Sequence, residues 1–195
     1  MRSRQTNKPD KYIVSECVKV LRDELPYNLH IFVNSVEFIA KVIDTLKLAP
    51  EAVKIVCSTS GDSRQENQRK LGNAYPIGQP SDPAKKINFY TSTCFEGCDI
   101  FDPDGVTFIV SDGRKAHTLL DISTLFTQIC GRIRDSRYKA QIVHVYSTTK
   151  YSKTVTLDEF VAATQRTLAD AESYAAEINS LSEATRVKTL SKIPY

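Results

Sequence analysis

The sequence predicts an α/β domain with a mostly parallel central sheet, because short apolar runs alternate with segments of helical periodicity. The runs are continuous rather than alternating and are rich in Val, Ile, Phe and Tyr. Such runs are typical of strands that are covered on both faces by helices. The expected strands are 30–35, 53–60, 87–93, 106–112 and 141–149.

Helical segments lie between these runs, and their apolar residues recur at three-and-four spacing. The expected helices are 11–25, 35–46 and 117–133. The apolar stripes are Val14, Val18, Leu21 and Leu25 in the first and Val36, Ile39, Ile43 and Leu46 in the second. Strands that alternate with helices favour right-handed crossover connections.

The character of the sequence changes near its carboxyl end. We expect residues 1–150 to form the α/β domain and residues 151–195 to form a helical extension. Leu157, Leu168 and Ile178 fall on one stripe of a long amphipathic helix with an acidic outer face. This helix is expected to pack on the domain, and the alternative is that it awaits a partner surface outside the chain.

Composition and charge are those of an ordinary globular protein, with 41% hydrophobic and 25% charged residues and a formal net charge of +3. No stretch is long and apolar enough for a membrane span, and the basic start of the chain is not a secretory signal. We therefore expect a cytoplasmic protein with no membrane partner. Basic clusters at 64–70 and 131–139 admit a polyanionic partner, although a solvated surface explains them equally well.

The five cysteines form an odd set without a Cys-x-x-Cys pair, which suits reduced thiols in apolar elements. Cys94 and Cys98 lie four positions apart, but no histidine is near them in sequence. A zinc site needs four ligands in recognisable pairs, so no metal site is expected. A nucleophilic Cys94 would likewise need a histidine placed to activate it.

The apolar runs end in small polar residues: Asn34-Ser35, Ser58-Thr59-Ser60, Thr91-Ser92-Thr93, Ser111-Asp112 and Ser147-Thr148-Thr149. In a parallel sheet all these exits lie along one edge, which is where open α/β sheets bind ligands. The alternative is that the same side chains cap the helices that follow. Both roles are compatible, because a capped helix start is itself an anion site.

The segment QICGRIRD (128–135) holds Gln128, Gly131, Arg132 and Arg134 at the end of a helical pattern. Guanidinium groups match the oxygens of phosphate and stay charged, so this set favours recognition of a phosphate. An Arg-x-Arg pair by itself is usually just a basic helix face.

Three segments together resemble motifs of superfamily 2 helicases. YTSTCFEGCDI (90–100) resembles motif V, with its Thr and its Gly-x-Asp, and QICGRIRD (128–135) resembles motif VI, Gln-x-x-Gly-Arg followed by another Arg. HIFVNSVEFIAKVIDTL (30–46) resembles motif IV with its helix. Order and spacing match over roughly residues 10–150. The resemblance implies the C-terminal RecA-like domain of a DNA or RNA helicase, a three-layer fold.

The resemblance also implies how such a domain handles ATP. Gly97 and Asp99 would lie against the ribose and the cleft. Arg132 and Arg134 would reach the γ-phosphate as arginine fingers, and Gln128 would couple them to the other domain. ATP with Mg²⁺ would be bound only together with an N-terminal RecA-like domain. An arginine finger raises the rate of phosphoryl transfer about 10³- to 10⁵-fold, because it stabilises charge on the transferred phosphoryl group.

Nucleic acid would lie across the top of both domains. By the same resemblance, Thr91, Ser92 and Ser35 would contact its backbone. Base-specific readout is not expected, because backbone contacts carry no sequence information.

The spacing within motif VI departs from the family. Common members place the second arginine three residues after the first, whereas Arg134 follows Arg132 by two. On a helix, a shift of one residue turns a side chain by about 100°. The second finger is therefore either Arg134, as in relatives with Gly-Arg-x-Arg, or Arg137.

The sequence contains neither Gly-x-x-x-x-Gly-Lys-Ser/Thr nor Asp-Glu-x-Asp/His. The chain is therefore expected to be half of an ATPase, supplying motifs IV, V and VI, and to hydrolyse nothing alone. The alternative is a nucleic-acid-binding or protein-interaction module with a RecA-like shape and no motor activity. A third class, a single-domain enzyme of another α/β type, would need a phosphate loop or a nucleophile–histidine pair.

Overall fold

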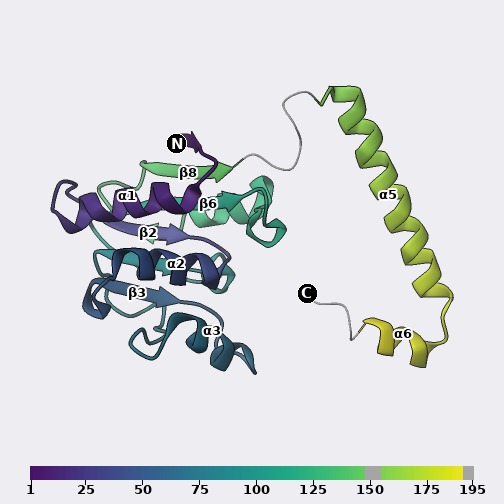
Figure 1. Cartoon of the computed structure of the whole chain (residues 1–195), viewed down its shortest axis with the longest axis horizontal. Helices are drawn as coiled ribbons and strands as arrows, with labels where there is room; N and C mark the ends of the chain where they lie inside the picture. The colour runs from purple at the N-terminus through teal and green to yellow at the C-terminus, as the bar shows by residue number, and fades with distance from the viewer. Residues whose placement is uncertain (148–154, 191–195) are drawn as a thin grey trace. The chain divides into compact units, whose positions relative to one another are not determined.

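The computed structural model of the chain describes residues 1–147 and 155–190 (Figure 1). The chain divides into two compact units, Met1–Lys150 and Tyr151–Tyr195, which are considered separately here. The expected boundary between 150 and 151 lies outside the described residues, as does the end of the expected strand 141–149.

A six-stranded sheet forms the centre of the first unit, in the order β1-β8-β6-β2-β4-β3. Across the described residues, every pairing within this sheet is parallel. The α/β class with a mostly parallel sheet is therefore confirmed, and the arrangement is consistent with a RecA-like fold. The strands are β1 Arg2–Gln5, β2 Asn28–Phe32, β3 Val53–Val56, β4 Ile87–Tyr90, β6 Gly105–Asp112 and β8 Ile142–Ser147.

Each of the five expected apolar runs overlaps one of these strands, although β2 begins two residues before its run and β6 begins one residue before its run. β2, β3 and β4 stop before their polar exits, whereas β6 and β8 extend into theirs. In the middle of the sheet, Ile31 of β2 lies between Phe89 of β4 and Phe108 of β6. All three side chains are buried, so the continuous apolar composition reflects burial of the sheet on both faces.

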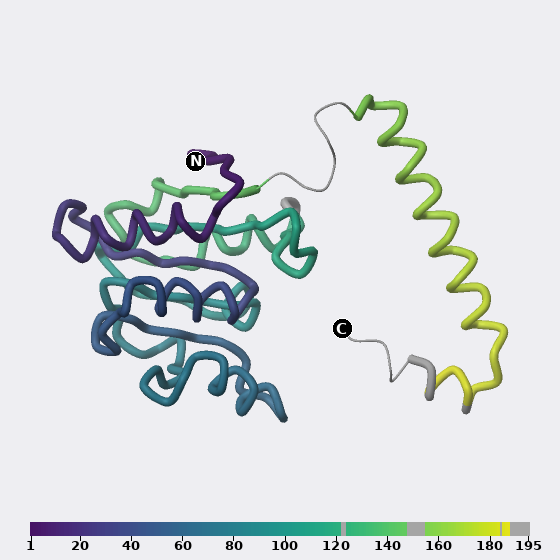
Figure 2. The backbone as a smooth tube through the Cα atoms, in the orientation of Figure 1, coloured from purple at the N-terminus to yellow at the C-terminus, as the bar shows by residue number. Residues whose placement is uncertain are grey.

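Strand β1 is a feature that the sequence analysis does not predict. Its residues, RSRQ, are polar and exposed along the whole strand. It pairs with β8 from Arg2↔Val143 to Gln5↔Tyr146, so segments far apart in the sequence lie side by side at one edge of the sheet (Figure 2). An edge strand without a buried face leaves no apolar signature, which explains why the pattern of the sequence does not reveal it.

Three helices cover one face of the sheet: α1 Pro9–Leu21, α2 Val36–Leu46 and α3 Ser63–Leu71 (Figure 1). The stripe expected for α1 is wrong by one position, because Ile13 and Cys17 are buried whereas Leu21 is 39% exposed. The α2 stripe is confirmed at Ile39 and Ile43, both of which are buried. A short 3₁₀ turn, η1 (Pro50–Ala52), leads into β3.

The connections after β4 and β6 cover the opposite face of the sheet. They contain the 3₁₀ turns η2 Ser92–Cys94 and η3 Ala116–Thr118, the π-helical turn η4 Ile122–Phe126, helix α4 Thr127–Cys130, and the two-residue strands β5 Ile100–Phe101 and β7 Ile133–Arg134. The helix expected at 117–133 is therefore shorter than predicted. Phe95, Ile100 and Ile129 pack there against Tyr90 and Ile109 of the sheet. The sheet is thus the middle of three layers.

A buried polar network joins β2, β4 and the turn before β6. The Tyr90 hydroxyl lies 3.1 Å from His30 Nδ1, and His30 Nε2 lies 2.7 Å from Asp102 Oδ2. Asp102 Oδ2 also accepts from Asn28 Nδ2 at 3.0 Å. Burial lowers the pKa of His30, so a neutral ring that donates through Nε2 and accepts at Nδ1 satisfies its neighbours. Although burial opposes ionisation, hydrogen bonds from His30, the Asp104 amide and Asn28 lower the pKa of Asp102.

Gly105 lies directly against this network. A Cβ atom at this position would lie 2.9 Å from His30 Nε2 and 3.1 Å from Ile133 Cγ2. The backbone of β6 therefore approaches both the buried histidine and strand β7 more closely than any other residue type permits.

The second unit consists of α5 Leu157–Ser180 and α6 Glu183–Leu190. A capping box starts α5, because the Thr156 hydroxyl accepts from the Glu159 amide and the Glu159 carboxylate accepts from the Thr156 amide. No side chain of α5 is buried, and Leu157 and Leu168 of the apolar stripe are 75% and 59% exposed. The packing of this helix on the domain remains a prediction. Within the described ranges, no helix is long and apolar enough to cross a membrane.

The close approach at Gly105 leads to a stability prediction. Gly105→Ala is expected to lower the free energy of unfolding by about 1–3 kcal/mol, because the added methyl group overpacks a well-filled region. Denaturant unfolding measures the change. Gly131→Ala is the matched control, since the nearest atom to its Cβ would be 3.6 Å away. Equal losses for the two variants would contradict the prediction.

The buried histidine leads to a pH prediction. Because the pKa of His30 is lowered from 6.5 on folding, the unfolded chain takes up a proton first as the pH falls. The free energy of unfolding is therefore expected to decrease as the pH falls through about 6.5. His30→Gln is expected to flatten this profile. Burial also lowers the pKa of His144. His144→Gln therefore serves as the comparison, and it should remove only the pH dependence of stability that His144 contributes.

Candidate functional site

A two-residue parallel ladder joins the segments 90–101 and 128–135. Ile100 pairs with Ile133 and Phe101 with Arg134, and the Ile100 amide donates to the Arg132 carbonyl at 2.9 Å. Ile100 and Ile133 are buried, whereas Phe101 is 68% exposed. The ladder is therefore anchored through its apolar residues, and the alternating side chains face outward.

Arg132 is held by backbone carbonyls rather than by a carboxylate. Its Nε donates to the Gln128 carbonyl at 3.0 Å, and Nη1 donates to the Cys98 carbonyl at 2.9 Å. In the part of the chain that the structure describes, no acidic side chain forms an ion pair with it. Because a guanidinium has five N–H donors, three remain for a ligand.

Arg134 forms an ion pair with Asp99. The distance between Arg134 Nε and Asp99 Oδ1 is 2.9 Å, and each side chain is 48% exposed. Exposed ion pairs contribute about 0–1 kcal/mol, so either partner can exchange the other for a ligand at little cost. Gln128, Arg132, Arg134 and Asp99 are called the arginine cluster below.

The glycine of the same segment has an unusual backbone. Gly97 has a φ of +70°, and no atom lies within 4 Å of the position that its Cβ would take. This φ lies in the left-handed region that favours glycine. Its exposed backbone lies two residues from Asp99, which leaves room for a ligand to approach.

The helical interpretation of the arginine spacing is wrong. α4 ends at Cys130, Arg134 lies in β7, and Asp135 has a φ of +57°. Side chains alternate along a strand, so Arg134 points to the side opposite the buried Ile133, and Arg132 lies one residue before the strand.

Arg137 lies with a different acidic residue. Its Nε donates to Asp104 Oδ1 at 2.6 Å, and its guanidinium lies 5.6 Å from the centre of the Tyr138 ring. Of the two candidates for a second finger, the structure brings Arg134 to Asp99 and leaves Arg137 at the turn before β6.

The connections that follow the neighbouring strands β2 and β4 lead to opposite faces of the sheet. α2 leaves β2 on one face of the sheet, and η2 leaves β4 on the opposite face. Such a switch point is where open α/β sheets bind ligands. The Ser92 amide lies 3.4 Å from Asn34 Oδ1, which links the two exits.

Polar residues at these exits differ in whether a ligand can reach their side chains. Ser35 is buried, and its hydroxyl caps α2 by accepting from the Phe38 amide at 3.2 Å. Thr91 is also buried, and its hydroxyl lies 3.4 Å from that of Thr93. Ser92 is exposed. Of the three residues expected to contact nucleic acid, Ser92 alone has an exposed side chain.

A hollow of about 260 Å³ opens at the exit of β2. Asn34 and Ser35 line it together with Asn67, Lys70 and His117. Asn34 Nδ2 donates to the His117 carbonyl at 2.9 Å, and Lys70 pairs with Glu66 at 2.7 Å. We refer to it as the strand-exit hollow. The basic segment 64–70 signalled Lys70 in the sequence, but nothing there indicated His117.

The polar residues at the exit of β6 bond to one another and to neighbouring parts of the domain. Asp112 pairs with Arg114 at 2.9 Å and accepts from the Ser147 hydroxyl at 2.7 Å. The hydrogen bonds from the Arg114 guanidinium hold the pKa of Asp112 well below its usual range. At this strand exit the polar side chains therefore have a local structural role.

The cysteines are all free. Burial raises the pKa of Cys94 to about 12, so it is a thiol at neutral pH rather than a nucleophile. Among the described residues, no group of three or more His, Cys, Asp or Glu side chains is arranged to hold a metal ion.

No family model matches the sequence, and no curated protein matches it. The function of the arginine cluster and of the strand-exit hollow is therefore inferred from their residues and geometry.

The exposed ion pair leads to a prediction about its energy. In a double-mutant cycle of Asp99→Asn and Arg134→Gln, the coupling energy is expected to be below about 1 kcal/mol. Denaturant unfolding of the four proteins measures it. A coupling of several kcal/mol would mean that the pair is structural and is not available to a ligand.

Proposed function

We propose that the first unit is the C-terminal motor lobe of an ATP-dependent helicase or translocase that works on DNA or RNA. The observation that supports this most strongly is the β5–β7 ladder, which joins Asp99 to the two arginines, Arg132 and Arg134. These are the residues that a lobe resembling superfamily 2 helicases would turn toward a nucleotide. ATP with Mg²⁺ would be bound between this lobe and an N-terminal RecA-like lobe.

The arginine cluster has the chemistry that phosphoryl transfer requires. Charge spreads over the γ-phosphate oxygens in the transition state, and guanidinium donors that are already in position stabilise it. Arg132 is positioned by two carbonyls and keeps free donors. Asp99 can accept from ribose hydroxyls once Arg134 turns to the phosphate, and the exposed backbone of Gly97 permits close approach of the nucleotide. Gln128, whose carbonyl holds Arg132, is on the surface that would face the other lobe.

The strand-exit hollow is proposed to contact the nucleic-acid backbone. Lys70 of the hollow contributes a positive charge. Ser92 lies outside the hollow, is linked to Asn34 of its lining through the Ser92 amide, and contributes an exposed hydroxyl beside it. Ser35 acts through the helix start that it caps, since the first amides of α2 attract phosphate. Thr91 supports the turn that carries Ser92. Contacts of this kind fix position and carry no base specificity.

An ATPase assay with a matching N-terminal lobe tests this function. We expect turnover that nucleic acid stimulates, and we expect Arg132→Ala to lower kcat by about 10³ or more. Arg22→Ala, which changes an exposed arginine directly after α1, is the control and should leave kcat unchanged. The chain alone should not hydrolyse ATP. Nucleic-acid binding without any restored ATPase would instead favour the adaptor module, and turnover by the chain alone that Arg132→Ala abolishes would contradict the proposal.

Binding of the isolated chain to nucleic acid tests the strand-exit hollow. Binding is expected to be weak and steeply salt-dependent, because contacts to phosphate dominate it. Lys70→Ala should reduce the slope of log K against log salt by about 1, with Arg22→Ala again as control. Tight binding that is insensitive to salt would count against backbone contacts.

A further inference from the structure

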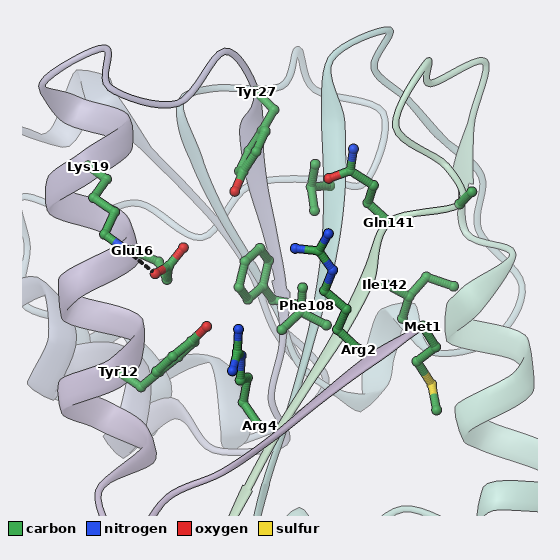
Figure 3. A pocket seen from close by; sticks show the side chains of 13 residues that line it. Met1, Arg2, Arg4, Tyr12, Glu16, Lys19, Tyr27, Phe108, Gln141 and Ile142 are labelled. Atoms are coloured by element: carbon green, nitrogen blue, oxygen red, sulfur yellow. Dashed lines mark hydrogen bonds and ion pairs between the residues drawn. The ribbon is translucent and has the colours of Figure 1, made fainter.

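A second hollow, of about 470 Å³, lies between α1 and the strands β1, β6 and β8 (Figure 3). Tyr27, directly before β2, and Gln141, directly before β8, line it, so it opens at the amino ends of the strands. Its floor residue Phe108 belongs to the core under α1, whereas Ile100 and Ile129 beside the arginine cluster belong to the core of the opposite face. This amino-end hollow is therefore separate from both sites described above.

Two arginines form one wall of the amino-end hollow. Arg2 and Arg4 occupy alternate positions of β1 and so point to the same side of the strand. Figure 3 shows both guanidinium groups directed into the hollow. Within the residues that the structure describes, neither guanidinium group has a hydrogen-bond or ion-pair partner. Two guanidinium groups without partners side by side are an arrangement that an anion stabilises.

Helix α1 and Tyr27 form the facing wall. Tyr12 and Tyr27 direct their hydroxyls into the hollow, and the Phe108 ring lies between the two walls (Figure 3). Burial raises the pKa of Tyr27, so its hydroxyl remains a donor at neutral pH. Lys19 Nζ lies 2.7 Å from Glu16 Oε1 and offsets its charge. The arginines therefore leave the hollow with a net positive charge.

We propose that the amino-end hollow binds a phosphorylated small molecule. Arg2 and Arg4 hold the phosphate, because guanidinium forks match its oxygens in geometry and charge. The hydroxyl-bearing body of the ligand lies against Tyr12, Tyr27 and Glu16, where the second carboxylate oxygen accepts from a hydroxyl. The volume falls within the range of about 300–1,000 Å³ that is usual for small-molecule sites. Binding at this site does not depend on the ATPase proposed above.

Titration of the purified chain with inorganic phosphate, ribose 5-phosphate and AMP tests the proposal by calorimetry. We expect saturable binding of ribose 5-phosphate or AMP that is tighter than binding of inorganic phosphate. A preference between the two esters identifies the source of the phosphate as a sugar phosphate or a nucleotide. No saturable binding of either ester, or equal affinity for all three, would overturn the proposal.

Variants locate the binding site. Arg2→Gln and Arg4→Gln are each expected to weaken ester binding about tenfold, because each removes charge-assisted hydrogen bonds. Both residues are exposed on an edge strand, so the unfolding midpoint should change little. Arg22→Gln is the control and should leave the affinity unchanged. Loss of binding in Arg132→Ala with full binding in Arg2→Gln would assign the ligand to the arginine cluster and refute this site.

A third variant distinguishes recognition of the hydroxyl-bearing part of the ligand from recognition of its phosphate. Tyr27→Phe removes one hydroxyl and keeps the ring, so it is expected to weaken ribose 5-phosphate or AMP several-fold and inorganic phosphate hardly at all. An equal effect on all three titrants would contradict the orientation of the ligand.

Discussion

The geometry of the candidate site depends on the two-residue ladder between β5 and β7. A ladder this short contributes little by its own hydrogen bonds, so its stability comes from Ile100 and Ile133, which are buried in the cores that flank the sheet. The alternation of side chains then determines what faces outward: Phe101 and Arg134 from the ladder itself, with Arg132 one step earlier. The charged groups of the candidate site are thus positioned by buried apolar residues, which is the usual way a rigid scaffold orients a site.

Polar residues at the strand ends show how one sequence feature serves two purposes. Ser35 caps α2 and Asp112 binds Arg114 and Ser147, so both have partners within the fold. Ser92 is exposed, and its amide donates to Asn34 of the neighbouring exit. A strand exit is therefore a poor guide to a ligand contact until the local hydrogen bonds are known. The same principle applies to His30 and Asp102, whose buried pair looks like catalytic chemistry but completes a closed set of hydrogen bonds inside the core.

Strong local patterns made much of this fold predictable from the sequence. The five apolar runs predicted five strands because burial on both faces requires continuous apolar composition, as at Ile31, Phe89 and Phe108. β1 was missed because an exposed edge strand has no such requirement, and the stripe of α1 was displaced because Cys17 and Ile13, rather than Val14 and Val18, turn inward. The candidate residues of segments 90–100 and 128–135 were chosen by their spacing, but the contact between the two segments was not predicted, since a ladder that joins positions thirty-three apart (100 and 133) depends on tertiary packing. The amino-end hollow was not foreseen for the same reason: it combines a missed strand with a helix face.

The position of β1 at the end of the strand order has a consequence for handling this protein. β1 covers the flank of β8, a strand of alternating Val, His, Val and Tyr that is well suited to recruit another chain. β1 carries Arg2 and Arg4 at this edge of the sheet, and like charges on two approaching copies repel each other. The four polar residues of β1 therefore shield the edge of β8 against self-association, and their removal would leave that edge open to pairing with another copy and to fibrous aggregation.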